Sequence, residues 1–334
     1  MACMEIIPFD EYQYAANERF YKRVGLSFGK KFKTFASDAR FAMALATDFY
    51  KRMKARIKQK ETLRVYEFGV GEGSLGVKFL LELRKLSETL AENTVYYFCD
   101  FSEELIKNAV NRADAFGFNA EGVVYDGIRE PKFLTEPDYV FMSEFYDDLP
   151  AKILLRNGKE VLEIMMEGKK KTLAMFKGDK KIHAYMEKMP EGYYIPINVA
   201  AKRHLDFCAS SLTADGCIDI FDYGFRSADE IKRMPTDMWN NSIIREYDEQ
   251  ITTDVNFDFL SAGLNAEIET QLEFVEKTLC KKFYEVEMDR LRYLSEKELR
   301  CSKRKLKKYG YPSNFWKEAS ESHGYLHMRV SRSV

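Results

Sequence analysis

The chain has 334 residues, 46% of them hydrophobic, and a formal net charge of −1 at pH 7. This composition can bury a sizeable core, which excludes a globally disordered chain. The balanced charge excludes a protein that binds nucleic acid through its overall charge.

The cysteines and the apolar runs indicate the compartment. Six cysteines are scattered without a C-x-x-C pair, a pattern typical of reduced thiols in a cytosol-like compartment. No apolar run approaches the ~20 residues that span a bilayer. The first residues, MACMEIIP, lack a basic segment before an apolar stretch, so no secretory signal is expected. We therefore expect a cytoplasmic protein without a membrane partner.

Residues 1–60 are predicted to form an N-terminal helical extension. The side chain of Ser37 can cap a helix that runs to about residue 59, with three large apolar residues on one face, Phe41, Leu45 and Phe49. The basic end of this helix, KRMKARIKQK, is typical of a solvated helix terminus.

From residue 63 onward, short apolar runs alternate with amphipathic segments. Such alternation predicts an α/β fold, a parallel sheet with helices on both faces. Helices are expected over residues 75–90, after a cap at Ser102, and over residues 198–212. The expected parallel strands are Leu63–Phe68, Val95–Cys99, Gly122–Tyr125, Tyr139–Met142 and Cys217–Phe221.

Two segments depart from this alternation. Residues 151–197 carry the turn signals N-G and M-E-G-K between apolar runs, which predicts an antiparallel β insertion. Residues 271–320 are charged and mostly helical in pattern, which predicts a helical insertion. Tyr325–Val330 is expected to be the last strand, at the edge of the sheet. Residues 61–334 are therefore predicted to form one α/β domain that carries both insertions.

A glycine turn, EFGVGEGSLG, follows the first predicted strand. Glycines let the backbone approach a ligand, and free N–H groups at a helix start face it. The spacing of Gly71, Gly73 and Gly76 fits a dinucleotide fold. The series Glu67-x-Gly69-x-Gly71-x-Gly73 instead resembles the first motif of class I S-adenosylmethionine methyltransferases. There the carboxylate would face the cofactor's ammonium and sulfonium groups. A turn with only a structural role is the remaining alternative.

The second predicted strand ends in Asp100. A carboxylate at this position can accept both hydroxyls of a ribose, which fits either kind of cofactor. The alternative is that Asp100 helps to cap the next helix.

The fourth predicted strand ends in DYVFMSEFYDDLP, an acidic loop with two aromatic residues. Ligands of open α/β sheets bind at the carboxyl ends of the strands, so Glu144, Asp147 and Asp148 are expected on the cofactor side. Such carboxylates could hold a cationic substrate group through charge-assisted hydrogen bonds. A solvated acidic loop is the alternative. Ser143, at the strand end, is a further candidate for cofactor binding.

Other catalytic motifs do not occur in the sequence. There is no G-x-x-x-x-G-K-S/T, G-x-S-x-G or H-E-x-x-H. His323 and His327 are four residues apart on a predicted strand, which separates them by ~13 Å, too far to share a metal. No metal site is predicted, and the histidines are expected to have structural or surface roles.

Five stretches in order resemble the MidA-type family of S-adenosylmethionine-dependent methyltransferases, which includes the mitochondrial complex I assembly factor that methylates a protein arginine. They cover roughly residues 29–275, and the most distinctive, SEFYDDLP, is similar to the family's NEFFDALP. The stretches are GKKFKTFAS (29–37), YEFGVGEGSL (66–75), SEFYDDLP (143–150), DIFDYGF (219–225) and ITTDVNFDFL (251–260) with Thr270–Gln271.

The resemblance implies a class I methyltransferase sheet with S-adenosyl-L-methionine as cofactor and a protein arginine as methyl acceptor. Glu144 and Asp147 become candidate catalytic residues that hold and orient the guanidinium, and residues 29–37 become a loop over the cofactor. A protein substrate is the expected partner, and a homodimer is also compatible with the sequence. The cofactor-binding candidates are Glu67, Gly69, Gly71, Gly73, Asp100 and Ser143.

The substrate side departs from the family pattern. Lys78 stands where the family has Asp, and neither the family's G-T-L nor its nearby His occurs between D-Y-G and I-T. These departures favour an alternative, a non-catalytic S-adenosylmethionine-binding or assembly protein that retains the fold. A third alternative is methylation of RNA or a small molecule. An N-P-P-Y-type tetrapeptide after the fourth strand would favour amino methylation of bases, but S-E-F-Y stands there. The basic run at 301–310 is typical of a solvated helix end.

Overall fold

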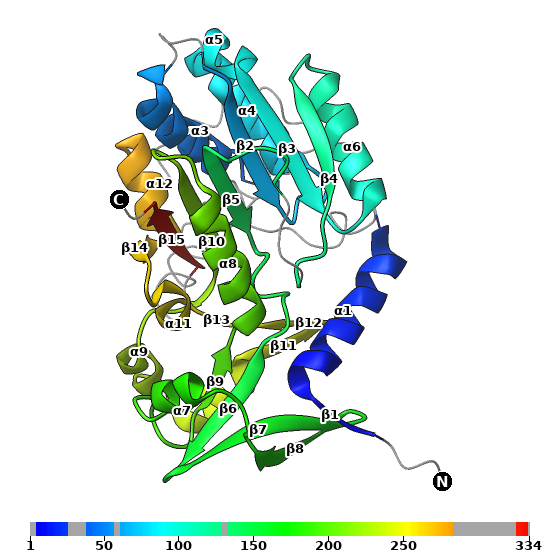
Figure 1. The fold of residues 1–334 in the computed structure, drawn as a ribbon, viewed down its shortest axis with the longest axis vertical. Helices are drawn as coiled ribbons and strands as arrows, with labels where there is room; N and C mark the ends of the chain where they lie inside the picture. Colours follow the sequence, from blue (N-terminus) through cyan, green and yellow to red (C-terminus); the bar gives the residue numbers. More distant parts are fainter. Residues whose placement is uncertain (1–4, 26–37, 57–60, 129–132, 283–324, 333–334) are drawn as a thin grey trace, which may run out of the picture.

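The computed structural model describes residues 5–25, 38–56, 61–128, 133–282 and 325–332. The predicted loop at 29–37, the basic run at 301–310, His323 and most of the predicted helical insertion lie outside the described residues. Within the described part, a large mixed sheet and a smaller antiparallel sheet lie at opposite ends, with α1 (Phe9–Val24) along one side between them (Figure 1).

The large sheet has eight strands in the order β14-β15-β10-β5-β2-β3-β4, with β13 beside β10. The five strands from β10 to β4 are parallel, as the βα alternation predicted, whereas β15 runs antiparallel to both of its neighbours. The strands are β2 (Leu63–Phe68), β3 (Thr94–Asp100), β4 (Ala120–Val124), β5 (Tyr139–Ser143), β10 (Cys217–Phe225), β13 (Val255–Asn256), β14 (Asn265–Thr270) and β15 (Tyr325–Ser331).

Helices cover both faces of this sheet, and the alternation of side chains along each strand explains why. Val65 packs with the helices of one face, and its neighbour Tyr66 packs with those of the other. The first face carries α3 (Ala39–Met53), α4 (Ser74–Leu86), α5 (Glu88–Glu92), α6 (Glu103–Asp114) and α12 (Gln271–Leu279); the second carries α8 (Val199–Ser211) and α11 (Phe257–Ser261).

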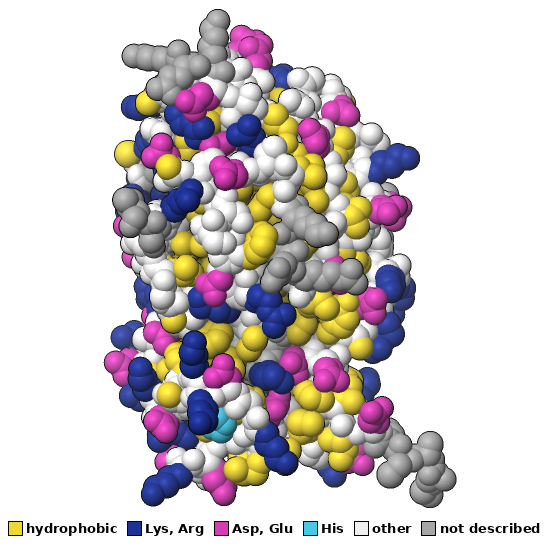
Figure 2. Space-filling view, viewed as in Figure 1, with side chains coloured by type: hydrophobic (Ala, Val, Ile, Leu, Met, Phe, Trp, Pro, Cys, Tyr) yellow, Lys and Arg dark blue, Asp and Glu magenta, His cyan; other side chains and the backbone are white. Residues whose placement is uncertain are grey.

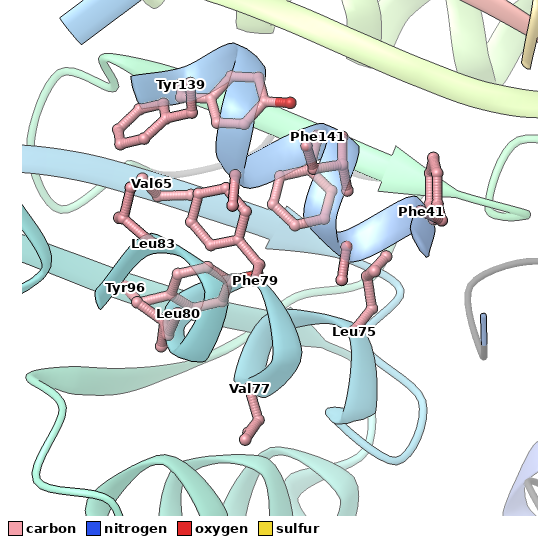
Figure 3. Packing of buried hydrophobic residues seen from close by; sticks show 14 of the residues in the cluster. Phe41, Val65, Leu75, Val77, Phe79, Leu80, Leu83, Tyr96, Tyr139 and Phe141 are labelled. Atoms are coloured by element: carbon pink, nitrogen blue, oxygen red, sulfur yellow. The ribbon is translucent and has the colours of Figure 1, made fainter. Parts of the chain in front are cut away.

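The core of the first face is aromatic. Phe79 from α4 and Tyr96, Tyr139 and Phe141 from the strands lie together in a cluster in which all four are fully buried (Figure 3). Burial of an aromatic side chain stabilises the fold by about 1.5–3 kcal/mol relative to exposure. This packing fixes the central strands, whose carboxyl ends carry the predicted site.

The smaller sheet is antiparallel and arises from the hairpins predicted at 151–197. Gly158 and Gly168 have positive φ values of 61° and 60° in its two tight turns, a conformation that glycine adopts without strain. The sheet has the order β1-β7-β6-β9, with β8 on β7, and comprises β1 (Ile6–Pro8), β6 (Lys152–Asn157), β7 (Glu160–Glu167), β8 (Lys170–Met175) and β9 (Tyr194–Ile197).

The division of the chain into an extension at 1–60, a domain at 61–334 and its two insertions stays a prediction.

A third hydrophobic cluster joins this sheet to the segments around it, and Trp239 is fully buried within it. Figure 2 shows Lys, Arg, Asp and Glu side chains intermingled over the face in view, as the net charge of −1 predicts. The remaining elements are α7 (Lys180–Met186), α9 (Ala228–Lys232), α10 (Thr236–Ser242), β11 (Ile244–Tyr247) and β12 (Gln250–Thr253).

Two predictions were wrong, one about the place of the last strand in the sheet and one about the ends of helix α3. The predicted edge strand β15 is internal, because β14, which the sequence pattern did not reveal, pairs with its outer side. The N-cap of α3 is Asp38, whose side chain accepts a hydrogen bond from the Arg40 backbone N–H, and the helix ends at Met53. Asp and Ser are both good caps, so adjacent candidates cannot be separated by sequence alone. No helix in the described segments has the length and hydropathy needed to cross a membrane.

Candidate active site

A cavity of about 620 Å³ opens at the carboxyl ends of β2, β3 and β5. Open α/β sheets bind ligands there, because the loops that leave neighbouring parallel strands diverge. Of the eight predicted site residues, Gly73 alone does not line this cavity. The structure brings the other seven together around it: Glu67, Gly69, Gly71, Asp100, Ser143, Glu144 and Asp147.

The glycine turn connects β2 to α4, and all three of its predicted glycines have positive φ values. Their surroundings differ. A Cβ atom at Gly73 would lie 2.3 Å from the Ala109 Cβ of α6, and one at Gly69 would lie 2.9 Å from the Phe145 ring. A Cβ atom at Gly71 would meet nothing within 4 Å, and Gly71 lines the cavity. Gly71 therefore gives a ligand direct access to the backbone, whereas Gly73 allows α6 to pack.

Glu67 lies at the end of the central strand β2 and is 3% exposed. Its carboxyl group accepts a 2.8 Å hydrogen bond from the Tyr96 hydroxyl of the neighbouring strand. Burial raises the pKa of Glu67 to about 8, although the bond from Tyr96 lowers it. The side chain is therefore an acid that would gain its charge when a cation enters the cavity.

Asp100 lies at the tip of β3, on the wall of the cavity next to Glu67. Burial raises its pKa to about 6, and backbone N–H groups, above all that of Ser102 at 3.1 Å, oppose this shift. Ser102 itself caps α6, as predicted. The carboxyl group of Asp100 is thus anchored by the backbone of the turn that follows it, and Asp100 also lines the cavity.

Glu144 is one of few non-glycine residues of the described chain with a positive φ, 52°. This left-handed conformation is strained for a residue with a Cβ atom, and such strain is frequent at functional sites. The backbone N–H of Glu144 donates a 2.8 Å hydrogen bond to the Phe221 carbonyl of β10. The left-handed backbone at Glu144 bends the chain where the acidic loop leaves β5.

Asp222 of β10 holds this loop, a role that sequence reasoning missed. Its Oδ2 atom accepts hydrogen bonds from three successive backbone N–H groups, those of Phe145 at 3.2 Å, Tyr146 at 2.8 Å and Asp147 at 3.2 Å. Its Oδ1 atom accepts one from the Tyr223 N–H at 2.8 Å. The D-Y-G motif in the sequence was the available signal, but a fully buried carboxylate that binds a loop 75 residues away cannot be read from it.

Asp147 is 4% exposed and lines the cavity. Among the described residues, its Oδ1 atom has no hydrogen-bond partner. Burial raises its pKa well above the ordinary value, and the neighbouring Asp222 carboxylate raises it further. A buried carboxyl oxygen without a donor is costly, and a cationic or hydrogen-bond-donating ligand would remove that cost.

Helix α1 forms one wall of the cavity, and no pattern in the sequence indicated this placement. The buried amide of Gln13 donates to the Asp147 carbonyl at 3.2 Å and accepts from the Ala151 N–H at 3.0 Å. The Tyr21 hydroxyl donates to the side chain of Asp148, which also accepts a hydrogen bond from Gln250. These contacts fasten the N-terminal helix to the acidic loop from outside the α/β alternation.

Tyr223 and Tyr325 lie opposite each other on β10 and β15 and line the same end of the cavity. Their hydroxyls are hydrogen-bonded to each other, and the Tyr223 hydroxyl lies 3.4 Å from Glu144 Oε2. Arg245 covers the Tyr223 ring at 5.0 Å and is paired with Asp254 at 2.5 Å. This end of the cavity is therefore built from carboxyl and phenol groups.

The two described buried histidines lie among side chains rather than beside a metal cluster. His204 contacts the Tyr146 hydroxyl at 2.9 Å, and burial lowers its pKa to about 3. His327 contacts Asp219 at 2.9 Å. Across the described residues, no group of three or more His, Cys, Asp or Glu side chains could hold a metal ion.

A glycine turn at the carboxyl end of a central parallel strand, with an acidic residue on the next strand, defines a nucleoside-binding α/β protein. A family model described as "Putative S-adenosyl-L-methionine-dependent methyltransferase" matches residues 44–269, and the chain belongs to that family. The predicted cofactor, S-adenosyl-L-methionine, and the predicted α/β methyltransferase fold are thereby confirmed.

Two crystal structures from Burkholderia thailandensis have the same fold. One, named as a "likely methyl transferase" bound to S-adenosyl-homocysteine, shares 19% identity and a TM-score of 0.67, with 98% of this chain and 88% of that chain covered. The other, named as an uncharacterized protein of the same superfamily, has 19% identity, a TM-score of 0.68 and coverage of 98% and 87%. No curated protein matches the chain.

Proposed function

We propose that the chain transfers a methyl group from S-adenosylmethionine to a nitrogen of a cationic protein side chain, an arginine by resemblance to the MidA-type family. The residues around the cavity suit this cofactor. Gly69 and Gly71 leave the backbone accessible, Glu67 would face the cofactor's cationic groups, and Asp100 would accept its ribose hydroxyls. Ser143, whose hydroxyl has no partner within the described part of the chain, would bind polar atoms of the methionine portion.

The observation that carries the proposal is the charge of the cavity. Among the described residues that line it, eight bear carboxyl groups and one, Lys22, bears a cation. S-adenosylmethionine, with one carboxylate and two cationic groups, brings a net charge of about +1 and cannot balance so many acids. A second cation, the methyl acceptor, would offset part of the remaining excess of carboxyl groups. The acids of the lining are Glu18, Glu67, Glu72, Asp100, Asp126, Glu144, Asp147 and Asp148.

The cofactor supplies an electrophilic methyl group, and the chain supplies position and charge. Glu144 and Asp147 would hold the guanidinium through charge-assisted hydrogen bonds that fix the direction of its nitrogen. A guanidinium nitrogen must lose a proton as it is methylated, and a carboxylate at its side is a suitable acceptor. Asp222 would act through the loop, by keeping Glu144 and Asp147 directed into the cavity.

The proposed partner is therefore a protein that presents an arginine, and a homodimer stays a prediction. We also propose a cytosol-like, reducing compartment, because the cysteines within the described residues, Cys99, Cys208, Cys217 and Cys280, are free thiols.

The test is transfer of an isotopically heavy methyl group into a lysate of the source cells, followed by mass spectrometry of the labelled peptides. The proposal expects heavy mono- or dimethylarginine in specific peptides with wild-type protein, and roughly tenfold to over a hundredfold less of it with Glu144→Gln. Label in RNA or a small molecule would change the substrate class. Tight cofactor binding without any transfer would instead support the non-catalytic assembly protein.

A further inference from the structure

The carboxyl groups of Asp147 and Asp222 are neighbours with unequal surroundings. Burial raises the pKa of Asp222 to about 7, and the four backbone N–H hydrogen bonds that it accepts oppose this shift and favour its ionised form over that of Asp147. Asp147 lies beside it with one oxygen that has no described donor, and only its backbone is anchored, by Gln13 and by the Thr253 N–H at 2.9 Å. Both side chains are buried.

The charges around Asp147 come from every element packed against it. Asp148 and Glu144 on its own loop and Asp222 on β10 oppose its ionisation, whereas Arg245 on β11 favours it. Arg245 is already paired with Asp254, which weakens its effect on Asp147. The other titratable groups that face it are phenols, Tyr21 on α1, Tyr223 on β10 and Tyr325 on β15.

We propose that Asp147 and Asp222 share one negative charge, with Asp222 ionised and Asp147 protonated until a cationic acceptor group enters the cavity and displaces the proton from Asp147. The proposal rests on the function proposed above, since it assigns Asp147 to the acceptor. Two close buried carboxyl groups cannot both ionise without a cation that balances the second charge, and the nearby Arg245 is already paired with Asp254. Entry of the acceptor would supply that cation, release the proton to solvent and leave Asp147 ionised beside the nitrogen to be methylated.

This pair would make binding of the acceptor depend on pH. Below the pH at which Asp147 titrates, each bound cation releases about one proton, so affinity rises about tenfold per pH unit. Above that pH, release stops and the affinity no longer depends on Asp147. A neutral acceptor of the same shape would release no proton at any pH.

The first experiment examines the protein without an acceptor. Infrared difference spectra between wild type and Asp147→Asn at pH 7 should contain the C=O stretching band of a protonated carboxylic acid. Glu67→Gln supplies a reference difference spectrum, because burial raises the Glu67 pKa to about 8. A wild-type spectrum without the Asp147 acid band would overturn the proposal, whatever the protein methylates.

The second experiment measures proton release. Ethylguanidinium is titrated into the protein saturated with S-adenosylhomocysteine, by calorimetry in phosphate and in Tris between pH 5.5 and 8.5, with N-ethylurea as the neutral control. Wild type should release about one proton per bound cation at the acid end, and Asp147→Asn none. Asp222→Asn, which removes the like charge, should lower the pH at which release ends.

The outcomes separate the two proposals. An acid band at Asp147 without any ethylguanidinium binding would contradict a guanidinium acceptor and leave the carboxyl pair intact. Ethylguanidinium binding with equal heats in both buffers, after correction for dilution, would contradict the carboxyl pair and leave the acceptor class intact. If Asp222→Asn does not fold, the comparison of wild type with Asp147→Asn decides the matter.

Discussion

The Tyr96 hydroxyl donates a 2.8 Å hydrogen bond to Glu67, and the two side chains meet directly over Gly76. A Cβ atom at Gly76 would lie 2.5 Å from Glu67 Oε2 and 2.5 Å from the Tyr96 hydroxyl oxygen. The third glycine of the apparent dinucleotide spacing is therefore required by this contact. It brings α4 onto the buried acid of β2, which explains a G-x-G-x-x-G match in a protein of another cofactor class.

Glu67→Gln should change how stability depends on pH. Burial raises the folded-state pKa of Glu67 to about 8, above its value of 4.5 in a model peptide. Folding thus favours the protonated form of Glu67. The loss of unfolding free energy that Glu67 causes is therefore absent below pH ~4.5 and grows until the pH passes ~8. Between pH 5 and 8 the free energy of unfolding should fall by a few kcal/mol more in wild type than in Glu67→Gln.

Urea denaturation of the cofactor-free protein at both pH values measures this difference, with the exposed-site variant Glu92→Gln as control. Identical pH dependence of Glu67→Gln and wild type would show that Glu67 is ionised in the free protein. In either case Glu67→Gln should weaken the binding of S-adenosylmethionine more than the binding of S-adenosylhomocysteine, because S-adenosylhomocysteine lacks the sulfonium charge.

Substitutions at two glycines of the turn should have different effects, one mainly on cofactor binding and the other mainly on stability. At Gly71 (φ +50°) a leucine side chain would extend into the cavity, so Gly71→Leu should abolish cofactor binding and cost about 1 kcal/mol of stability for the left-handed backbone. Gly73→Ala would push a Cβ atom into α6 and should destabilise the fold by more, about 2–4 kcal/mol.

Isothermal titration with S-adenosylhomocysteine and thermal melts distinguish these effects. Unchanged affinity of a folded Gly71→Leu protein would place the cofactor elsewhere, and a Gly73→Ala protein as stable as wild type would mean that α6 can shift without cost.

Glu144 carries two separable features, its charge and its strained backbone. Glu144→Gln keeps the shape and should reduce methyl transfer by roughly tenfold to over a hundredfold, since charge-assisted hydrogen bonds contribute ~1.5–3 kcal/mol. Glu144→Gly removes the charge and the strain at φ 52°, so it should reduce transfer at least as much while stabilising the fold by about 1 kcal/mol.

The measurements are heavy-methyl incorporation, cofactor titration and denaturation midpoints. Cofactor affinity should remain nearly that of wild type in both Glu144 variants. Loss of cofactor binding together with transfer would assign Glu144 to the cofactor pocket instead of the acceptor.

Asp219 on β10 should contribute stability without affecting the cavity. Despite its burial, pairing with Arg329 and His327 lowers the pKa of Asp219 well below its ordinary value, so its contribution is present at neutral pH and is lost as the pH falls. Asp219→Asn removes one of the two carboxylates that pair with Arg329 at 2.7 Å, the other being Asp48, and should cost about 3–5 kcal/mol.

The exposed pair formed by Arg226 and Glu230 is the matched control, and Arg226→Gln should cost less than ~1 kcal/mol. Urea midpoints and cofactor titrations test both variants. Asp219→Asn and Arg226→Gln should lose different amounts of unfolding free energy, and equal losses would contradict the structural role of Asp219. A loss of cofactor affinity in folded Asp219→Asn would also contradict a purely structural role.

The sequence was sufficient for the parallel strands and for the residues that line the cavity at the carboxyl ends of β2, β3 and β5. The strands β2, β3 and β5 are mostly apolar runs. An acidic residue lies at or directly after the end of each, so local chain geometry alone places that residue at the carboxyl end of its strand. Because parallel strands end at the same edge, Glu67, Asp100 and Glu144 had to converge once the sheet was recognised. Gly71 followed from the turn that joins β2 to α4.

The tertiary structure alone decided the end of the cavity that is proposed to bind the acceptor. Gln13 reaches the acidic loop across 134 positions of sequence, Asp222 holds Asp147 across 75, and Tyr223 meets Tyr325 across 102. None of these contacts has a local pattern, because an amide, a carboxylate or a phenol looks the same in sequence whether it faces solvent or a buried backbone. Their partners are set by the order in which strands join the sheet, and the pairing of β15 between β10 and β14 is a choice of long-range packing that no periodicity encodes.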